Sequence, residues 1–180
     1  MKRFIFLLLF SFCALYGFSQ TKKITKTGEI NFEASVPSFE EVAAKNKSTT
    51  VVLNTETGEI AALALIKSFR FKIALMEEHF NENYMESNRY PKATFKGKVY
   101  GFDLAKLSEN NRDFSIKGIL ELHGKSKEIT VPAKIRKTAD SIELITNFSV
   151  NSDDFNIEIP KVVSNKVAKK VNISLNCNLK

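Results

Sequence analysis

Few residues of this chain carry side chains that could do chemistry, and they lie far apart. There are two histidines, His79 and His123. Glu78 and Glu82 lie near His79, but a metal site needs about three converging ligands, and no second histidine is nearby. We therefore predict no metal site and no cofactor. We interpret His79 as a packed or hydrogen-bonded residue where a helix meets a sheet, and His123 as a turn residue on a polar face.

The other reactive side chains lack partners that would make them catalytic. No histidine or lysine that would activate Cys177 as a nucleophile is identifiable. Two adjacent aspartates, Asp153 and Asp154, follow an Asn-Ser pair, which is typical of a turn or a helix N-cap. The sequence has no glycine-rich phosphate loop and no Gly-x-Ser-x-Gly motif. We expect that the protein is not an enzyme; an enzyme acting on a lipid would need a polar cluster that only His79 and Cys177 could begin.

The basic charge of the chain does not favour nucleic acid as a partner. The formal net charge is +7, but the lysines alternate with apolar residues and are interspersed with glutamates. Only Lys166, Lys169 and Lys170 form a cluster. The chain has no tryptophan, and its 15 phenylalanines fall mostly on apolar faces or near the N-terminus. We predict a solvated surface that makes transient contact with anionic membrane head groups.

The first residues have the composition of a signal peptide. Lys2 and Arg3 precede an apolar run from Phe4 to Leu15, which is short for a bilayer span. Small residues follow, so we predict cleavage after Ser19 and one domain over residues 20–180. A retained membrane anchor is the alternative. The remaining chain would have a single cysteine and no internal disulfide, which favours a periplasmic or secreted protein of bacterial type.

The period of the hydrophobic pattern changes between residues 76 and 99. Met76, Phe80 and Tyr84 recur at helical spacing, which predicts one helix at about residues 74–86. Pro91 cannot continue a helix. From Lys92 to Val99, apolar and polar residues then alternate, which predicts a strand with one wet face.

Most of the remaining chain alternates in the same way between turn signals. Eight strands are predicted, near residues 23–34, 49–56, 59–71, 92–100, 113–123, 127–137, 141–150 and 167–179. Each has one apolar face, so either two sheets pack together or one sheet closes on itself. We favour the closed barrel, because the strands are long for a sandwich and closure removes exposed edges. The fold class is therefore all-β, an eight-stranded antiparallel barrel with one covering α-helix.

Two details of this pattern lead to further expectations. The run from Ile60 to Ile66 is apolar on both faces, and we expect the helix to cover its outer face. Gly97, Gly118 and Ala133 lie on the inward faces of their strands. We expect these small residues to leave room for a slim ligand inside the barrel.

Several segments together resemble the YceI-like family of exported lipid-binding proteins. They are Ile66–Phe69 with the following helix and the run RYPKATF from Arg89 to Phe95, the strand pair Phe114–Leu120 and Gly124–Pro132, and the region Phe148–Phe155 with Ile157. The resemblance extends from about Gly28 to Leu179. It implies an extended, lipocalin-like barrel whose hydrophobic tunnel holds a polyisoprenoid or another long-chain amphiphile. Ser38–Thr50 departs from the family pattern, because it has a charged, helix-like sequence.

The favoured function is thus an exported, periplasmic protein that holds a polyisoprenoid or fatty-acyl lipid. We expect the large inward-facing residues to line the site: Phe69, Phe71, Phe95, Val99, Phe114, Ile116, Leu120, Ile142, Leu144, Phe148 and Ile173. We expect His79, Tyr84 and Arg89 at the mouth, where a head group would lie. The alternative is a structural or interaction barrel of the envelope stress response, with a filled core and no ligand. A homodimer stays open.

Overall fold

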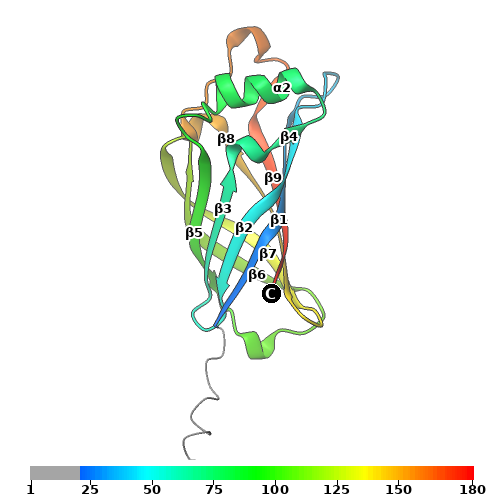
Figure 1. Ribbon diagram of the computed structural model, residues 1–180, viewed down its shortest axis with the longest axis vertical. Helices are drawn as coiled ribbons and strands as arrows, with labels where there is room; N and C mark the ends of the chain where they lie inside the picture. Colours follow the sequence, from blue (N-terminus) through cyan, green and yellow to red (C-terminus); the bar gives the residue numbers. More distant parts are fainter. Residues whose placement is uncertain (1–20) are drawn as a thin grey trace, which may run out of the picture.

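The computed structural model describes residues 21–180 and shows a barrel closed at its long edges (Figure 1). The predicted signal peptide lies outside the described residues. The long strands are β1 (Lys22–Ser35), β2 (Ala43–Asn54), β3 (Glu59–Leu65), β5 (Lys92–Tyr100), β6 (Arg112–Leu122), β7 (Lys125–Lys137), β8 (Ile142–Asn151) and β9 (Val167–Leu179). Within residues 21–180, no helix has the length and apolarity needed to cross a membrane.

These eight strands form one antiparallel ring. The order is β1-β9-β8-β7-β6-β5-β3-β2, and pairing between β1 and β2 closes it. A ninth, short strand, β4 (Arg70–Phe71), pairs with β2 on the same edge as β3 does. The prediction of an eight-stranded antiparallel barrel is confirmed.

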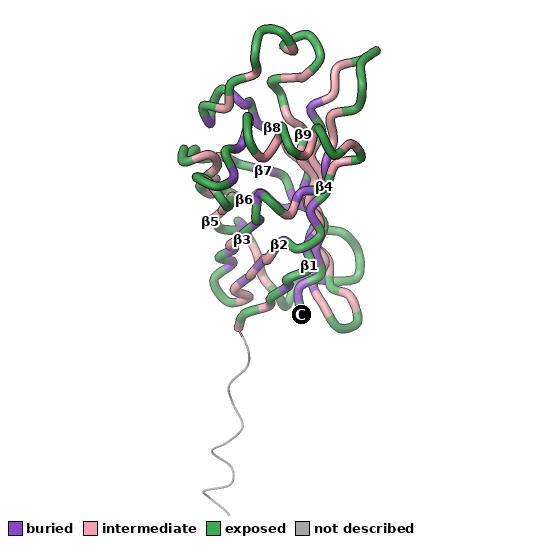
Figure 2. The backbone as a smooth tube through the Cα atoms, turned by 45° about the horizontal axis from the view of Figure 1, so that its top comes forward, coloured by how far each residue is buried: buried purple, intermediate pink, exposed green. Residues whose placement is uncertain are grey.

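The apolar faces of the strands meet inside the barrel, as the alternation requires. One half of the interior is filled by a packed core around Leu53, Val99, Ile135, Leu144 and Leu179. Figure 2 shows buried residues along the strands and exposed residues on the loops and the helix. The filled half lies away from α2.

The predicted strand 59–71 is interrupted. β3 ends at Leu65, a 3₁₀ turn covers Ile66–Ser68, and β4 follows. The turn places the buried side chains of Ile66 and Phe69 in the interior, and the Ile66 N–H donates to the Pro91 carbonyl, 2.9 Å away. Alternation reports which face a residue occupies, but not where the chain leaves the sheet.

The expectation that the helix covers the outer face of β3 is wrong. Leu63 and Leu65 are exposed on the outer wall, and the helix lies across one end of the barrel (Figure 1). The apolar run Ile60–Ile66 therefore has only one packed face.

The helix-like reading of Ser38–Thr50 is also wrong. After a short turn the chain enters β2 at Ala43, which pairs with Glu33 of β1. The buried Asn46 side chain donates to the Leu65 carbonyl at 3.1 Å. Pairing on both edges of β2 overrides the local helical preference, as is common for strands.

The predicted helix at about residues 74–86 is confirmed as 11 helical residues. Helix α2 spans Ala74–His79 and continues as one π-helical turn over Phe80–Tyr84. The chain turns at Glu86, whose φ is +42°.

The expected room at the inward glycines is absent. Gly97 and Gly118 pair directly across β5 and β6, and the Phe95 ring lies over both. A Cβ atom on Gly118 would meet the Gly97 Cα and the Phe95 Cζ at 2.6 Å. Ala133 lies in the packed core. These small residues make space for other protein atoms rather than for a ligand.

Candidate functional site

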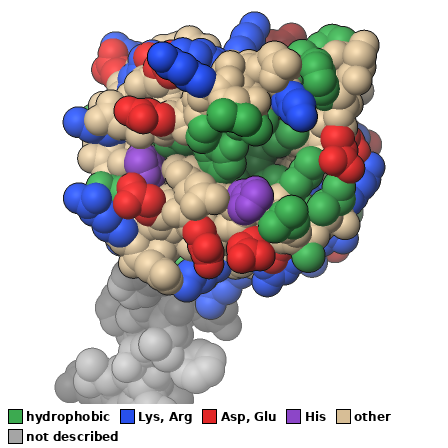
Figure 3. Space-filling model, turned by 90° about the horizontal axis from the view of Figure 1, so that it is seen from above, with side chains coloured by type: hydrophobic (Ala, Val, Ile, Leu, Met, Phe, Trp, Pro, Cys, Tyr) green, Lys and Arg blue, Asp and Glu red, His purple; other side chains and the backbone are tan. Residues whose placement is uncertain are grey.

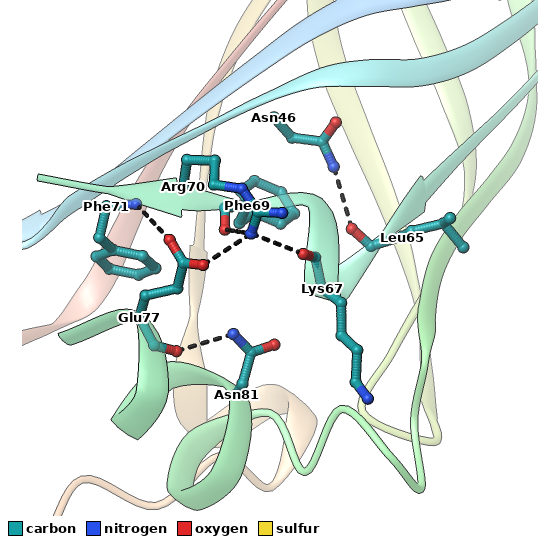
Figure 4. Close-up of polar contacts among 8 residues, drawn as sticks. All are labelled: Asn46, Leu65, Lys67, Phe69, Arg70, Phe71, Glu77 and Asn81. Carbon is teal, nitrogen blue, oxygen red and sulfur yellow. Dashed lines mark hydrogen bonds and ion pairs between the residues drawn. The ribbon is translucent and has the colours of Figure 1, made fainter. Parts of the chain in front are cut away.

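Helix α2 is fixed across the barrel end by a polar anchor (Figure 4). The Glu77 carboxylate accepts from Arg70 Nη1 at 2.7 Å and from the Phe71 backbone N–H at 3.1 Å. One turn further on, the Asn81 amide donates to the Glu77 carbonyl at 2.8 Å. Because β4 follows the break after β3, the backbone N–H of Phe71 is free to donate to the Glu77 side chain of the helix. This anchor fixes α2 against β4.

An aromatic cluster lies directly beneath this anchor. Phe80 of the π turn stacks on Phe32 of β1, with ring centroids 5.3 Å apart. Phe69 and Phe71 surround it at 5.8 and 5.1 Å. Such pairs add to the free energy gained from burying the rings. The four rings attach α2 to the barrel wall and supply part of an apolar surface beneath it.

A cavity of about 380 Å³ lies below α2 and opens at this end of the barrel. Its walls come from the inward faces of β1, β3, β8 and β9, from α2, and from the 3₁₀ turn Ser152–Phe155. They are overwhelmingly apolar. Figure 3 shows this end from above, with apolar side chains gathered around a hollow and charged side chains interspersed around them.

A smaller cavity of about 100 Å³ continues toward the middle of the barrel. It shares Ala64, Ala93, Leu120, Phe148 and Ile173 with the upper cavity. It also reaches residues of the packed core, which end it. The combined space is therefore a blind apolar pocket that is entered from the α2 end.

Five polar side chains are among the residues that line the upper cavity. They are Glu40, His79, Tyr84, Ser152 and Lys166. The Ser152 hydroxyl is buried and has no hydrogen-bond partner. In residues 21–180, no three His, Cys, Asp or Glu side chains gather closely enough to hold a metal ion. The arrangement can solvate a long apolar chain and offer a few polar groups near its entrance.

The two reactive side chains outside the pocket have structural surroundings. Cys177 is buried in the packed core, and burial raises the pKa of its thiol to about 12. His123 lies between two acceptors: Nδ1 is 3.1 Å from the Phe155 carbonyl and Nε2 is 3.0 Å from the Glu86 carboxylate. The interpretation of His123 as a simple turn residue on a polar face is incomplete, because its ring connects the β6–β7 turn to two segments at the barrel end.

Most of the predicted site residues lie on the walls of these cavities. The structure places there Phe69, Phe71, Phe95, Ile116, Leu120, Leu144, Phe148, Ile173, His79 and Tyr84. His79 is exposed at the opening rather than packed. Ligand contact by these residues stays a prediction.

Four predicted residues lie elsewhere. Val99, Phe114 and Ile142 belong to the packed half of the interior. Arg89 is exposed and its guanidinium lies 3.8 Å from Glu86, away from the cavity walls. Alternation identifies the inward face of a strand but not the height of a residue along the barrel, which is why these positions were misplaced.

Several wall residues were not anticipated: Ile30, Phe32, Ala64, Ile66, Met85, Ala93, Val150 and Phe155. Ala64 and Ala93 face each other across β3 and β5, and their small side chains leave the space that was expected at the glycines. Their inward phase was available from the alternation of β3 and β5. Met85 and Phe155 lie outside strands, so periodicity gave no signal for them.

The sequence of residues 17–179 matches the model of the YceI-like domain. The chain belongs to the YceI-like family. No curated protein matches it. The family assignment therefore confirms the resemblance found in the sequence.

Solved structures of similar fold come from several bacteria. A polyisoprenoid binding domain from Saccharophagus degradans, implicated in plant cell wall breakdown, has a TM-score of 0.76 at 16% identity and covers 89% of this chain and 98% of that one. Burkholderia cenocepacia BcnA has a TM-score of 0.71 at 14% identity, covering 85% and 96%. The Campylobacter jejuni YCEI protein has a TM-score of 0.60 at 19% identity, covering 81% and 89%. At these identities, the likeness establishes the shared YceI-like fold.

Proposed function

We propose that this YceI-like protein is an exported, periplasmic binding protein that holds a long-chain amphiphile, such as a polyisoprenoid or a fatty-acyl lipid. The observation that carries the proposal is the blind apolar pocket beneath α2. Its volume lies within the range of small-molecule sites. The Saccharophagus degradans neighbour, named as a polyisoprenoid binding domain, supports this ligand class.

The energetics of burial favour such a ligand. Each methylene moved from water into an apolar site contributes about 0.8 kcal/mol, so a chain of a dozen carbons could gain roughly 10 kcal/mol before the entropic costs of binding. Tail burial alone can thus supply affinity without specific polar contacts. The polar groups at the opening, among them His79 and Tyr84, would face a head group.

The alternative of a filled, ligand-free barrel fits only one half of the interior. Val99, Phe114 and their neighbours pack closely there, whereas the half below α2 is hollow. A hollow apolar interior gives up packing contacts that a purely structural barrel would retain. The presence of such a hollow beneath a well-anchored helix favours a binding role.

The test is direct identification of a bound lipid. Protein purified from its own host is analysed by native mass spectrometry and by organic extraction, and stripped protein is titrated with the fluorescent fatty acid cis-parinaric acid. We expect about one lipid per barrel and saturable probe binding. Absence of both copurified lipid and probe binding would refute the proposal.

A further inference from the structure

Three exposed apolar side chains surround the opening of the pocket, and we call them the apolar rim. Phe39 of the β1–β2 loop is 43% exposed, Leu75 of α2 is 57% exposed, and Val162 of the 3₁₀ turn Lys161–Val163 is 87% exposed. Their segments lie together at the α2 end in Figure 1. The cavity walls confirm this placement, because they include Phe39 itself.

Part of the rim borders the pocket, and part of it projects into solvent. Met76 and Val163 line the cavity, whereas their chain neighbours Leu75 and Val162 do not and are exposed to solvent. The apolar surface therefore continues from the pocket wall, through Phe39, to tips that project beyond it. Apolar groups gathered at one end of a soluble domain mark an interaction site.

We propose that the apolar rim docks on a phospholipid membrane surface, so that the pocket opens toward the lipid from which it is filled. This inference rests on the proposed lipid-binding function. Three separate tips with charged side chains between them suit shallow insertion into a fluid interface, where apolar groups enter among head groups without needing a matching surface. A rigid protein partner would need complementary shape across the hollow between the tips.

The charges at this end fit a lipid interface. Its ion pairs include Arg70–Glu77, Lys72–Glu41 and Lys169–Asp153. These pairs neutralise much of the charge, so apolar insertion supplies most of the attraction. Lys161 lies next to Val162, and Lys166 lies at the opening. Both can reach head-group phosphates once the rim inserts, which adds a modest preference for anionic lipid.

Vesicle flotation tests the docking surface. The chain from Gln20 onward, which contains the whole barrel, is mixed with vesicles of phosphatidylcholine alone or of phosphatidylcholine and phosphatidylglycerol at about 3:1. We expect binding to both, a few-fold tighter to the anionic mixture. The variant Leu75→Ser/Val162→Ser should lose at least tenfold in partition coefficient on either vesicle.

A control variant removes two exposed hydrophobic side chains from the outer wall. Tyr100 of β5 and Ile119 of β6 are 56% and 54% exposed, and neither lines the pocket. The variant Tyr100→Ser/Ile119→Ser should bind vesicles within twofold of the unmodified chain. Equal losses in both double variants would show that general surface apolarity, rather than the rim, drives binding, and would overturn the proposal.

Two measurements on the same samples separate docking from lipid binding. The affinity of stripped Leu75→Ser/Val162→Ser for cis-parinaric acid should be unchanged, because both side chains lie outside the pocket. A chain that carries lipid but does not float refutes the docking surface and leaves the proposed function standing. A chain that floats without carrying lipid supports the docking surface and refutes the proposed function. Sedimentation showing a dimer that the rim variant dissociates, without vesicle binding, would assign the rim to a second copy of the chain and overturn the membrane proposal.

Discussion

His123 and Glu86 join the β6–β7 turn to the segment that follows the helix, with 3.0 Å between His123 Nε2 and Glu86 Oε2. The other ring nitrogen lies 3.1 Å from the Phe155 carbonyl, and Tyr90 packs edge-on against the ring at 4.5 Å. A ring nitrogen that carries a proton can donate to the acceptor beside it. One side chain thus holds together two of the segments that border the pocket.

Replacing His123 should loosen this end of the barrel. His123 has φ of +50°, so Asn is the suitable substitution, because it tolerates positive φ. His123→Asn leaves the partly buried Phe155 carbonyl without its partner and breaks the contact with the exposed Glu86 carboxylate, and we expect the free energy of unfolding in urea to fall by about 1–3 kcal/mol. Arg89→Ala is the control: this exposed guanidinium near Glu86 should change it by less than about 0.5 kcal/mol. Equal stability of His123→Asn and the parent would contradict the role of the ring.

The cluster of four phenylalanines should decide whether the helix stays docked. Phe80→Ala removes the ring that contacts Phe32, Phe69 and Phe71. We expect a loss of about 1.5–3 kcal/mol in unfolding free energy, and faster amide hydrogen exchange over residues 74–84 than over the distant strands. Leu75→Ala, on the exposed side of the same helix, should leave exchange unchanged. Similar exchange in both variants would show that the polar anchor at Glu77 suffices.

The sequence predicts the ring of strands well because alternation is a local property. Each run from β5 to β9 shows which residues face inward, and that phase is preserved in the barrel. Height along the barrel is not local: it depends on strand stagger and on closure, which involves pairing between strands far apart in the sequence, such as β1 with β9. Phe95 and Val99 have the same phase on one strand, yet one borders a cavity and the other belongs to the packed core.

The pocket itself was only partly predictable for the same reason. A small inward residue predicts space, but Gly97 and Gly118 are covered by a neighbouring ring, whereas Ala64 and Ala93 border the cavity. Which small residue leaves a void depends on side chains brought in by other elements. The role of His123 likewise depends on partners 37 and 32 residues away along the chain, which no local pattern reveals.

Because the Phe95 ring covers Gly97 and Gly118, adding a side chain at Gly118 should destabilise the protein. Open space above the glycines would tolerate the same change. In Gly118→Ala the new methyl group meets the Gly97 Cα and the Phe95 ring. Overpacking of this kind costs about 1–3 kcal/mol, measurable as a lower urea midpoint with an unchanged slope. Ser115→Ala, on the exposed face of the same strand, is the control and should have little effect. A stabilised Gly118→Ala would mean that the space above the glycines is open.

Deprotonation of the Cys177 thiol should lower the free energy of unfolding at alkaline pH. Burial raises the pKa of its thiol from 9.0 to about 12. The folded state therefore holds this proton more tightly than the unfolded state, so the contribution is fully present below about pH 9 and is lost progressively as the pH rises toward 12. Urea titrations between pH 7 and 11 should show this loss in the parent. In Cys177→Ala the alkaline loss should be smaller, although the variant starts less stable. Identical pH profiles would contradict the assignment.

The pocket can be tested by filling it. Ala64 of β3 borders both cavities and faces Ala93, so the ring of Ala64→Phe would enter the space expected to hold a lipid tail. We expect at least a tenfold fall in copurified lipid and in cis-parinaric acid affinity. Unfolding free energy should be unchanged or higher, because the ring gains apolar contacts that the hollow lacks.

Ala133→Phe is the matched control for this substitution. Ala133 is equally small and buried, but it lies in the packed core. Here the same ring has no space, so the variant should lose about 1–3 kcal/mol of stability, and any folded fraction should retain its lipid. The two substitutions thus exchange effects: one removes ligand and spares stability, while the other does the reverse. If Ala64→Phe kept its full lipid content, the ligand would have to lie elsewhere than in the pocket beneath α2.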